Sequence, residues 1–334
     1  MPRLVCSIGE RTGIYLYLAG RAILAMRPSL RAEIFRVSAI VMVCTAFAPA
    51  KVDAQLGIFV GPPVPVASLP YSIRVVGSTS SPPITVDNIT VGVNGQFVDV
   101  TFYLNHGSDI SSVAGYQGTV AGPPLVAGIY TFRQFTRERF FGQGDYSEPG
   151  AARYSITVIV TAASNVGDAI EYYYPVLNHY FMTALPAEIA ALDGGAFAGW
   201  SRTGQKLSNV YLADPSTEGV PAPVTPVCRF YGLPSAGLDT HFFSASPAEC
   251  AAVEAKWPDI WILETVGAFY VYLPNTVDGT CPDGTVPVYR VYNNRPDANH
   301  RYMTSLVIRQ QMIAQFWAPE GYGNLGVVMC INGP

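Results

Sequence analysis

Three histidines recur in the C-terminal half of the chain at intervals of about 60 residues, which indicates internal repeats. Each lies in a similar string of aromatic and hydroxyl residues, around His179, His241 and His300. Three equivalent imidazoles could converge to bind Zn²⁺ or Cu²⁺, or could contact a ligand. Alternatively, each ring ties a loop to its own repeat. A structural bond is needed once in every repeat and a catalytic group once in a site, so the repetition favours the structural role, and no metal is assigned.

Two carboxylates occupy matching positions in the second and third repeats, where Glu264 and Glu320 each follow a tryptophan by three residues. The first repeat has Thr203 at this place. A pair of carboxylates is the machinery of glycoside hydrolysis. Their equal placement in two repeats favours a structural role instead, and Glu249 belongs to a helix-capping motif. The chain contains no nucleophile-elbow, zinc-protease, P-loop or dinucleotide-binding motif.

Two arginines lie beside aromatic residues in matching predicted strands. Arg229 precedes Phe230, and Arg290 follows Tyr289. Each arginine could form an ion pair with the glutamate of its own repeat, or stack on a ring. Both interpretations are structural, so we expect replacement of Arg290 to reduce stability and not ligand binding.

The elements around these side chains recur in the same order. An aromatic strand precedes each histidine, and a short helix and then a tryptophan follow it; the tryptophans are Trp200, Trp261 and Trp317. Ser246-Pro247-Ala248-Glu249 has the pattern of a capping box with proline in the first turn. Units of this size cannot each bury a core, so they must stack or close on one another. The sequence predicts a pseudo-threefold α+β domain over 168–330, with units at 168–214, 227–274 and 286–330.

These elements resemble a tandem repeat domain of unknown function found in secreted bacterial proteins. The resemblance rests on the Tyr-Arg-x-Tyr, His-aromatic-aromatic-x-Thr/Ser, Pro-Ala-Glu and Trp-x-x-Glu patterns, and it covers about 160 residues in three copies. It implies an exported module and no particular activity. In some members a catalytic domain such as a peptidase accompanies the repeats. The N-terminal part of this chain departs from that arrangement, because it carries no catalytic signature.

The region 55–165 has the character of a small β-domain. Short runs rich in Val, Ile, Tyr, Phe and Thr are separated by Gly, Pro, Asn and Asp. The predicted strands are Tyr71 to Val76, Ile89 to Val93, Phe97 to Leu104, Gly128 to Phe135 and Tyr154 to Thr161. Strands of this length and spacing indicate an antiparallel, immunoglobulin-like β-sandwich. The overall fold class is therefore mainly β with short helices.

The region 1–54 has the layout of an export signal. Its apolar run, Val37 to Ala48, is shorter than the roughly 20 residues that span a bilayer, and several arginines precede it. Small residues before Gln55 suit cleavage, so no membrane span is expected in the mature chain. The long basic lead suggests that Met26 is the true start. Cys44 lies near a lipoprotein-like position, but the bulky residues before it do not suit that processing.

The composition excludes several classes of protein. The 334 residues are 49% hydrophobic and 13% charged, against about 25% charged in an average domain. Without the region 1–54, 13 of the 20 basic and 21 of the 24 acidic residues remain, a net charge of −8. A chain of this sign repels phosphate backbones, so nucleic-acid binding is not expected. Low charge and many prolines and glycines likewise exclude a coiled coil.

Four cysteines lie outside the region 1–54, and an even number in an exported chain indicates two disulfides with three possible connectivities. Cys228 begins a repeat strand and Cys250 lies in the helix of the same repeat. Cys281 precedes the third repeat and Cys330 closes it. We therefore predict the pairs Cys228–Cys250 and Cys281–Cys330. No C-x-x-C spacing supports a zinc site.

The sequence favours a secreted, non-catalytic binding or adhesion module for a glycan or cell-envelope polymer, with no cofactor. Sugar faces stack on aromatic rings, and their hydroxyl groups need a few placed polar groups. The repeat-loop residues suited to such contacts are Asn178, Tyr180, Asp239, Asn299 and Arg301. A secreted hydrolase that uses the histidines and carboxylates of the repeats is one alternative, and a structural envelope protein is another. The oligomeric state stays open.

Overall fold

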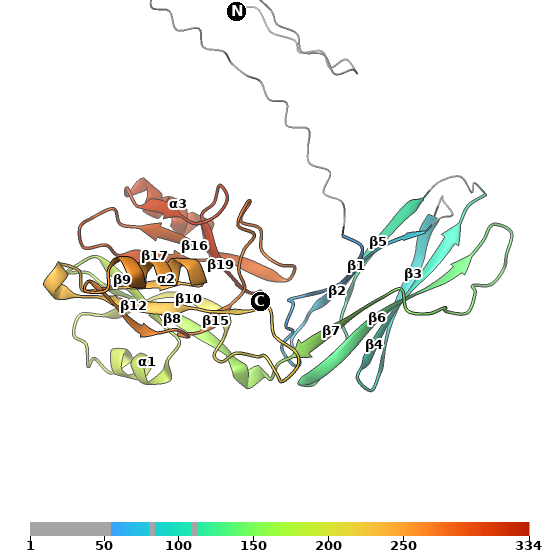
Figure 1. The fold of residues 1–334 in the computed structure, drawn as a ribbon, viewed down its shortest axis with the longest axis horizontal. Coiled ribbons are helices and arrows are strands. Elements are labelled where there is room, and N and C mark those ends of the chain that lie inside the picture. Colours follow the sequence, from blue (N-terminus) through green and yellow to red (C-terminus); the bar gives the residue numbers. More distant parts are fainter. Residues whose placement is uncertain (1–54, 80–83, 109–112, 334) are drawn as a thin grey trace, which may run out of the picture. The chain divides into compact units, whose positions relative to one another are not determined.

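The computed structural model describes residues 55–79, 84–108 and 113–333, and its fold is mainly β with three short α-helices (Figure 1). The expected export signal, with Met26 and Cys44, lies outside the described residues. In the described part of the chain, no helix is both long and apolar enough to cross a membrane.

The N-terminal strands form two sheets. One sheet has the order β1-β2-β5 and the other the order β3-β4-β6-β7. Their bounds are β1 Gly57–Gly61, β2 Ser72–Thr79, β3 Ile84–Asn94, β4 Phe97–His106, β5 Ala114–Ala121, β6 Gly128–Arg139 and β7 Tyr154–Val160. Neighbouring strands are antiparallel except β4 and β6, which are parallel. The expected all-antiparallel pairing is wrong at this point, because the chain crosses to β5 in the other sheet before it returns along β4.

Alternating side chains of β4 build the core between these two sheets. Val98, Val100, Phe102 and Leu104 are fully buried, whereas the residues between them are partly exposed. This period of two is the pattern of a strand with one face on the core. The same cluster includes Ile73 of β2, so the two sheets pack face to face.

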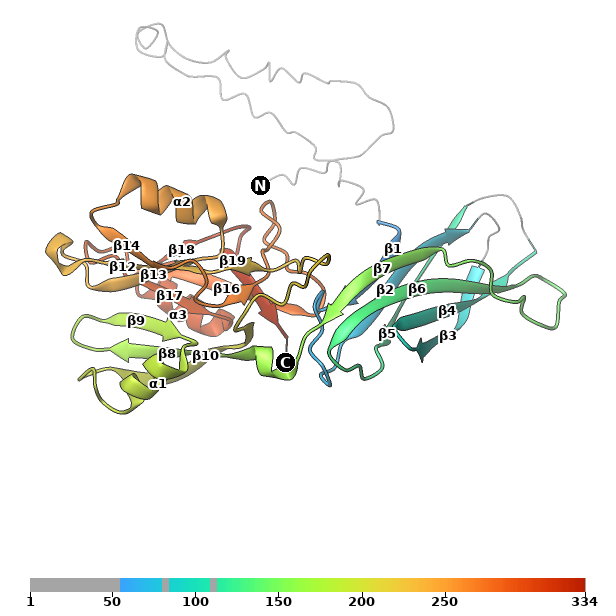
Figure 2. The ribbon, with the colours of Figure 1, turned by 60° about the horizontal axis from the view of Figure 1, so that its bottom comes forward.

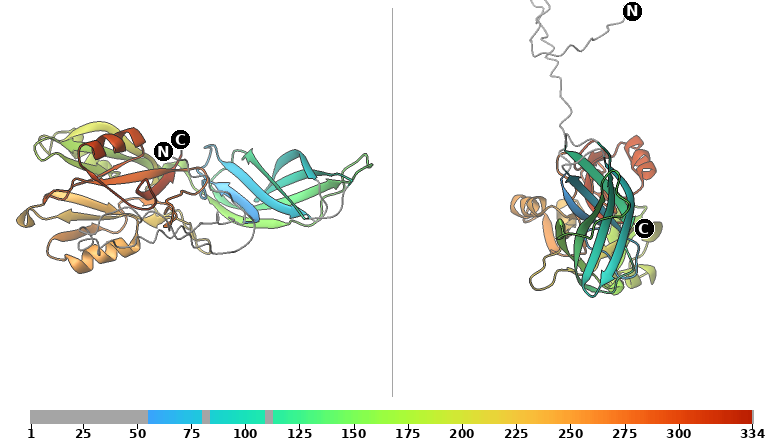
Figure 3. Two further views of the ribbon diagram at one scale, coloured as in Figure 1. Left: turned by 90° about the horizontal axis from the view of Figure 1, so that it is seen from above. Right: turned by 90° about the vertical axis from the view of Figure 1, so that its right-hand side faces the viewer.

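Three units with the same order of strand, strand, helix and strand follow in the chain (Figures 2 and 3). In each unit the first strand pairs antiparallel with the second and with the last. Unit one comprises β8 Val166–Tyr174, β9 His179–Thr183, α1 Pro186–Asp193 and β10 Ser201–Tyr211. Unit two comprises β12 Cys228–Gly232, β13 Thr240–Ser244, α2 Pro247–Lys256 and β14 Trp261–Thr265. Unit three comprises β16 Thr285–Tyr292, β17 His300–Met303, α3 Leu306–Ala314 and β18 Ala318–Glu320.

Three further strands and two 3₁₀ helices complete this part of the chain. They are β11 Thr225–Pro226, β15 Tyr270–Val271, β19 Val327–Asn332, and the 3₁₀ helices Ala163–Asn165 and Pro234–Ala236. The pair β11-β15 extends the sheet of unit one, and β19 pairs with β16. Disulfides join Cys228 to Cys250 and Cys281 to Cys330, the pairs expected from their positions in the sequence.

Local sequence sets where the helices begin. The Ser246 hydroxyl accepts a hydrogen bond from the Glu249 backbone N–H at 3.3 Å, and proline occupies the first turn of α2. The Glu249 carboxylate does not complete the expected capping box. The Ser244 hydroxyl accepts from the Ser246 N–H at 3.0 Å instead, and donates to Glu249 at 2.5 Å. The carboxylate of Glu249 is thereby free to bind a side chain of unit three.

The helix N-caps show which residues correspond between units, and they correct the expected alignment of the histidines. His241 and His300 each lie five residues before an N-cap, Ser246 and Ser305, whereas His179 lies six residues before the N-cap Leu185. Tyr180 therefore corresponds to His241 and His300, and His179 lies one residue earlier. Adjacent strand residues point to opposite faces of a sheet, so the side chain of His179 is on the other face from those of His241 and His300.

The same alignment relates two further sets of residues. Met182, Phe243 and Tyr302 each lie three residues before an N-cap, and their strand partners are Glu171, Arg229 and Arg290 respectively. The first unit thus carries an acid where the other two carry arginine.

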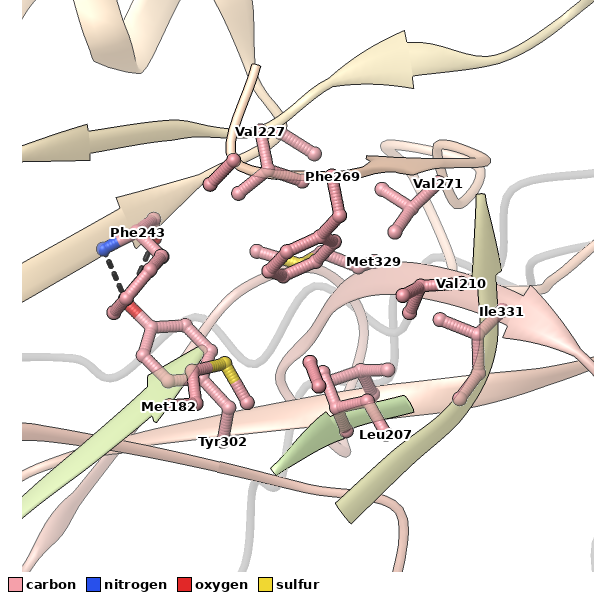
Figure 4. Packing of buried hydrophobic residues seen from close by; sticks show 14 of the residues in the cluster. Met182, Leu207, Val210, Val227, Phe243, Phe269, Val271, Tyr302, Met329 and Ile331 are labelled. Atoms are coloured by element: carbon pink, nitrogen blue, oxygen red, sulfur yellow. Dashed lines mark hydrogen bonds between the residues drawn. The ribbon is translucent and has the colours of Figure 1, made fainter. Parts of the chain in front are cut away.

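A core between the three units is built partly from the second strands. Met182 of β9, Phe243 of β13 and Tyr302 of β17 belong to one buried cluster (Figure 4). The Tyr302 hydroxyl accepts from the Phe243 N–H at 2.9 Å and donates to the Phe243 carbonyl at 2.7 Å. The Asn299 side chain bonds both backbone groups of Tyr180 in the same manner, at 2.8 and 3.0 Å. Side chains of unit three therefore satisfy the backbone groups of one residue in β9 and of one residue in β13.

Candidate functional site

A pocket of about 360 Å³ lies between unit one and unit two. Its volume is at the lower end of the range of about 300–1,000 Å³ that is usual for small-molecule sites. The lining is aromatic and charged, and it comes from both units: Phe181, Glu188, Leu192, Phe197, Trp200, Arg229, Tyr231, Asp239, His241 and Glu264.

Regular elements place most of the charged and aromatic groups of the pocket. Arg229 and Tyr231 are two residues apart on β12, so both point to the same face of the sheet. His241 is on β13, opposite Tyr231, and Glu264 is on β14. Glu188 comes from the first turn of α1 in the other unit. The pocket is thus assembled only when the two units pack together.

Arg229 is the centre of the charged side of the pocket. Its terminal nitrogens donate to both oxygens of Glu188 at 2.8 and 2.9 Å, and its Nε lies 2.8 Å from Glu264 Oε2. The arginine side chain is 9% exposed, and each glutamate side chain is 31% exposed. Bidentate pairing of this kind fixes the guanidinium plane and leaves the carboxylates partly open to the pocket.

His241 joins this network on the open side. Its Nε2 lies 3.3 Å from Glu264 Oε2, and its ring centre is 4.6 Å from that of Phe181. The His241 side chain is 23% exposed.

The two glutamates are ionised at neutral pH. Burial raises the pKa of Glu188, but hydrogen bonds from Arg229 and Thr183 outweigh burial and leave the pKa below its usual value. Burial also raises the pKa of Glu264. The hydrogen bond from His241 and the charge of Arg229 outweigh this effect, so the pKa of Glu264 is below its usual value. Burial and the hydrogen bond to Asp239 raise the pKa of Tyr231 to about 12, so its hydroxyl stays protonated.

Aromatic side chains form the opposite side of the pocket. The Trp200 ring stacks on Tyr174 with ring centres 5.4 Å apart and meets Phe181 edge-on at 6.1 Å. Gly199 has a φ of +89°, and a Cβ there would lie 2.5 Å from the Tyr174 ring, so glycine is required for this stacking. Phe197 is 55% exposed, so its ring is open to a ligand.

Units two and three repeat this charged arrangement in a more closed form. Arg290 donates to both oxygens of Glu249 at 3.0 and 2.7 Å, and its Nε lies 2.9 Å from Glu320. His300 Nε2 is 3.3 Å from Glu320, as His241 is from Glu264. The His300 side chain is only 10% exposed, and Phe242 beside it is buried. This contact is a structural counterpart of the pocket.

Unit three also contacts unit one, and here the acid lies at the position that carries arginine in the other two units. Glu171 replaces the arginine, and Arg301 donates to its two oxygens at 2.9 and 2.8 Å. The Thr203 hydroxyl donates to Glu171 at 2.6 Å, and the Arg301 guanidinium lies 4.0 Å from the centre of the Tyr180 ring. Glu171 and Arg301 are both buried.

The residues singled out in the sequence are distributed over these three contacts. Four of them line the pocket: Trp200, Arg229, His241 and Glu264. Three form its closed counterpart between units two and three: Arg290, His300 and Glu320. Trp261 packs against Phe242 with ring centres 6.1 Å apart, and Trp317 against Tyr180 at 5.8 Å.

The histidines do not converge on one point. His179 is buried, with Nδ1 at 3.1 Å from the Asp239 carbonyl oxygen and Nε2 at 3.1 Å from the Asp297 carboxylate. His241 and His300 contact different glutamates. Within the residues described, no group of three or more His, Cys, Asp or Glu side chains is placed to hold a metal ion.

Sequence reasoning missed five members of the pocket: Phe181, Glu188, Leu192, Phe197 and Tyr231. One signal could have revealed Glu188. Both Pro-Ala-Glu glutamates lie 41 residues before the arginine that they bind, Glu188 before Arg229 and Glu249 before Arg290. This repeated separation indicates a contact between successive units, and not within one.

Comparison with known proteins relates only the C-terminal part of the chain to a family. Residues 168–327 match the family model of a domain of unknown function, DUF5648. The matched range runs from β8 to the beginning of β19 and contains all three units. No curated protein and no solved structure matches the chain.

Proposed function

We propose that the protein is an exported, non-catalytic binding module and that the pocket between units one and two binds a glycan of the cell surface or envelope. The observation that carries this proposal is the combination of exposed aromatic rings with fixed carboxylates and a guanidinium in one pocket. Flat sugar faces pack on rings such as Trp200 and Phe197, and a few fixed polar groups orient the hydroxyls.

The electrostatics of the pocket favour binding over hydrolysis. A glycoside hydrolase needs one carboxylic acid whose raised pKa keeps a proton available for the leaving group. Glu188 and Glu264 instead have lowered pKa values, because hydrogen bonds from Arg229, Thr183 and His241 outweigh the effect of burial. Both carboxylates therefore accept hydrogen bonds at neutral pH and hold no proton to donate.

The two disulfides support export. Cys228–Cys250 lies within unit two, and Cys281–Cys330 joins the segment before β16 to β19; such bonds persist in oxidising compartments. An export signal in the region 1–54 agrees with this location.

A glycan array followed by calorimetry of the exported protein tests the proposal. We expect Phe197→Ala to weaken glycan binding at least tenfold without a change in melting temperature, because its ring is exposed and supports no core. Phe141→Ala is the matched control, since Phe141 is an exposed ring in the N-terminal domain. Trp200→Ala, with the exposed Trp257→Ala as its control, provides a second pair.

Two results would contradict the proposal. One is a full array without a bound glycan, which would favour a structural envelope protein. The other is an equal effect of the pocket variants and their controls, which would place the glycan elsewhere.

A secreted hydrolase is the second candidate, because His241 Nε2 lies 3.3 Å from a glutamate in an open pocket. Chromogenic esters, peptides and glycosides test it directly. Turnover that His241→Ala abolishes would replace the binding proposal with this one.

A further inference from the structure

The pocket carries an excess of negative charge. Its lining contains the carboxylates Glu188, Asp239 and Glu264 and a single guanidinium, Arg229. Arg229 is bound to both glutamates. No ion pair involves Asp239 in the described part of the chain, and its carboxylate only accepts a hydrogen bond from the Tyr231 hydroxyl at 2.9 Å. A concave site of one sign attracts ligands of the other sign.

The backbone does not require this aspartate. Asp239 has a φ of +65°, and the corresponding residues Asn178 and Ala298 have φ values of +55° and +47°. Asparagine suits this left-handed conformation as well as aspartate does. Asn178 also forms the same bond, because the Tyr173 hydroxyl donates to its Oδ1 at 3.1 Å. Compared with Asn178 of unit one, Asp239 of unit two therefore differs only in the negative charge of its carboxylate.

Aromatic rings line the same pocket as this carboxylate. Trp200, Phe181 and Tyr231 all line the pocket, and faces of such rings attract ammonium groups through the ring quadrupole. Phe181 already holds one cation in this manner, with the Arg229 guanidinium 5.9 Å from the ring centre. A neutral sugar would stack on the rings but would form no ion pair with the exposed Asp239 carboxylate.

We infer that the pocket recognises a protonated primary amine beside hydroxyl groups, and that its ligand is a glycan with free, unacylated amino sugars. This inference rests on the proposed glycan-binding function. An amino sugar offers an ammonium group and neighbouring hydroxyl donors together, which matches carboxylates set among rings. A lysine side chain offers only an ammonium group at the end of an apolar stem.

Calorimetry with two soluble probes tests the inference. The probes are β-1,4-linked glucosamine oligomers and the corresponding N-acetylglucosamine oligomers, which have the same backbone and no charge. We expect the exported protein to bind the amino oligomers at least tenfold more tightly. Added salt should reduce this preference, because it screens the charge.

Asp239→Asn separates charge from structure, since unit one carries asparagine at the corresponding position. We expect this variant to lose about tenfold in affinity for the amino oligomers relative to the acetylated oligomers, equal to about 1.4 kcal/mol of the preference. Asp259→Asn is the matched control, because it removes an exposed carboxylate of the same unit that does not line the pocket.

The possible outcomes distinguish the amine inference from the proposed glycan-binding function. Equal binding of the two probes, or an Asp239→Asn variant that keeps the preference, overturns the amine inference and leaves glycan binding intact. Failure of both probes and of all neutral glycans overturns the proposed function as well. Binding of a lysine peptide without binding of either oligomer contradicts the assignment to a sugar.

Discussion

Single buried arginines hold the contacts between successive units together. Arg290 is 6% exposed and binds Glu249 of unit two and Glu320 of its own unit. Removing one partner of a buried ion pair leaves the other charge without compensation, which costs more than the pair itself contributes. The charged part of each of these contacts therefore depends on one arginine side chain.

Replacement of this arginine gives a prediction at the residue scale. Arg290→Ala should lower the free energy of unfolding by about 2–4 kcal/mol, slightly below the range for fully buried pairs because its glutamates are one-third exposed. Glycan binding should be unchanged, because Arg290 does not line the pocket. Urea denaturation measures the effect. Lys206→Ala, which breaks an exposed pair with Asp168, should cost less than about 1 kcal/mol. A similar cost for both variants would contradict the role of Arg290.

Acid should destabilise the same contact in two steps. Burial lowers the pKa of His300 below 6.5, so its contribution to stability is present above that pH and is lost as the pH falls. Burial raises the pKa of Glu249, but Arg290 outweighs burial and leaves it below 4.5, so its contribution is present above 4.5 and is lost at lower pH. Urea unfolding between pH 7 and pH 3.5 measures both steps. His300→Gln should flatten only the upper step, and an unaltered profile would contradict the assignment.

At the scale of elements, side-chain patterns predicted some strands well and others not at all. Phe97 to Leu104 was predicted within β4, because its apolar residues alternate. The strand β5 was missed, since two glycines interrupt its pattern. Gly118 is needed there because a Cβ would lie 2.4 Å from Ile89 and 3.1 Å from Phe102 of the other sheet. The absence of a side chain is thus a requirement of sheet packing that a propensity pattern does not show.

Register was harder to predict than the existence of strands. In unit one, consecutive tyrosines 172–174 and the His179-Tyr180 pair look alike at neighbouring positions. Aligning His179 with His241 and His300 was therefore wrong by one residue. The helix starts carried the missing information, because an N-cap lies five residues after each of Tyr180, His241 and His300.

The two disulfides should differ in their contributions to stability. Cys281–Cys330 spans 49 residues and Cys228–Cys250 spans 22. In the chain-entropy account, these loops are worth about 4 and about 3 kcal/mol respectively, because a longer loop restricts the unfolded chain more. Paired alanine variants of each bridge, unfolded in guanidinium chloride, measure the difference. A greater loss from the shorter loop would show that native-state packing outweighs the loop term.

At the scale of the whole molecule, the three units contact one another in a closed cycle. Two contacts use an arginine of the later unit and a helix glutamate of the earlier one. The third uses Glu171 of unit one and Arg301 of unit three, and Ile308 takes the helix position of the missing glutamate. The sequence predicted three units in a pseudo-threefold domain, but this reversed pair has no repeated motif, so the residues of the closing contact were not predicted.

Charge exchange at the closing contact should be partly reversible. Glu171→Arg and Arg301→Glu should each lower the free energy of unfolding by about 3–5 kcal/mol, because each places like charges together in a buried contact. The double variant should recover at least about 1 kcal/mol relative to the sum of the single effects. A double-mutant cycle in urea measures this coupling. Simple additivity would show that the pair does not hold units one and three together.

Side chains of unit three cover part of the edges of β9 and β13, and this bears on self-association. An uncovered strand edge offers backbone donors and acceptors on which a second molecule can add a strand. The Asn299 amide and the Tyr302 hydroxyl bond these groups from within the same chain. Closure of the cycle therefore keeps these backbone groups from pairing with a second molecule, and it also completes the core.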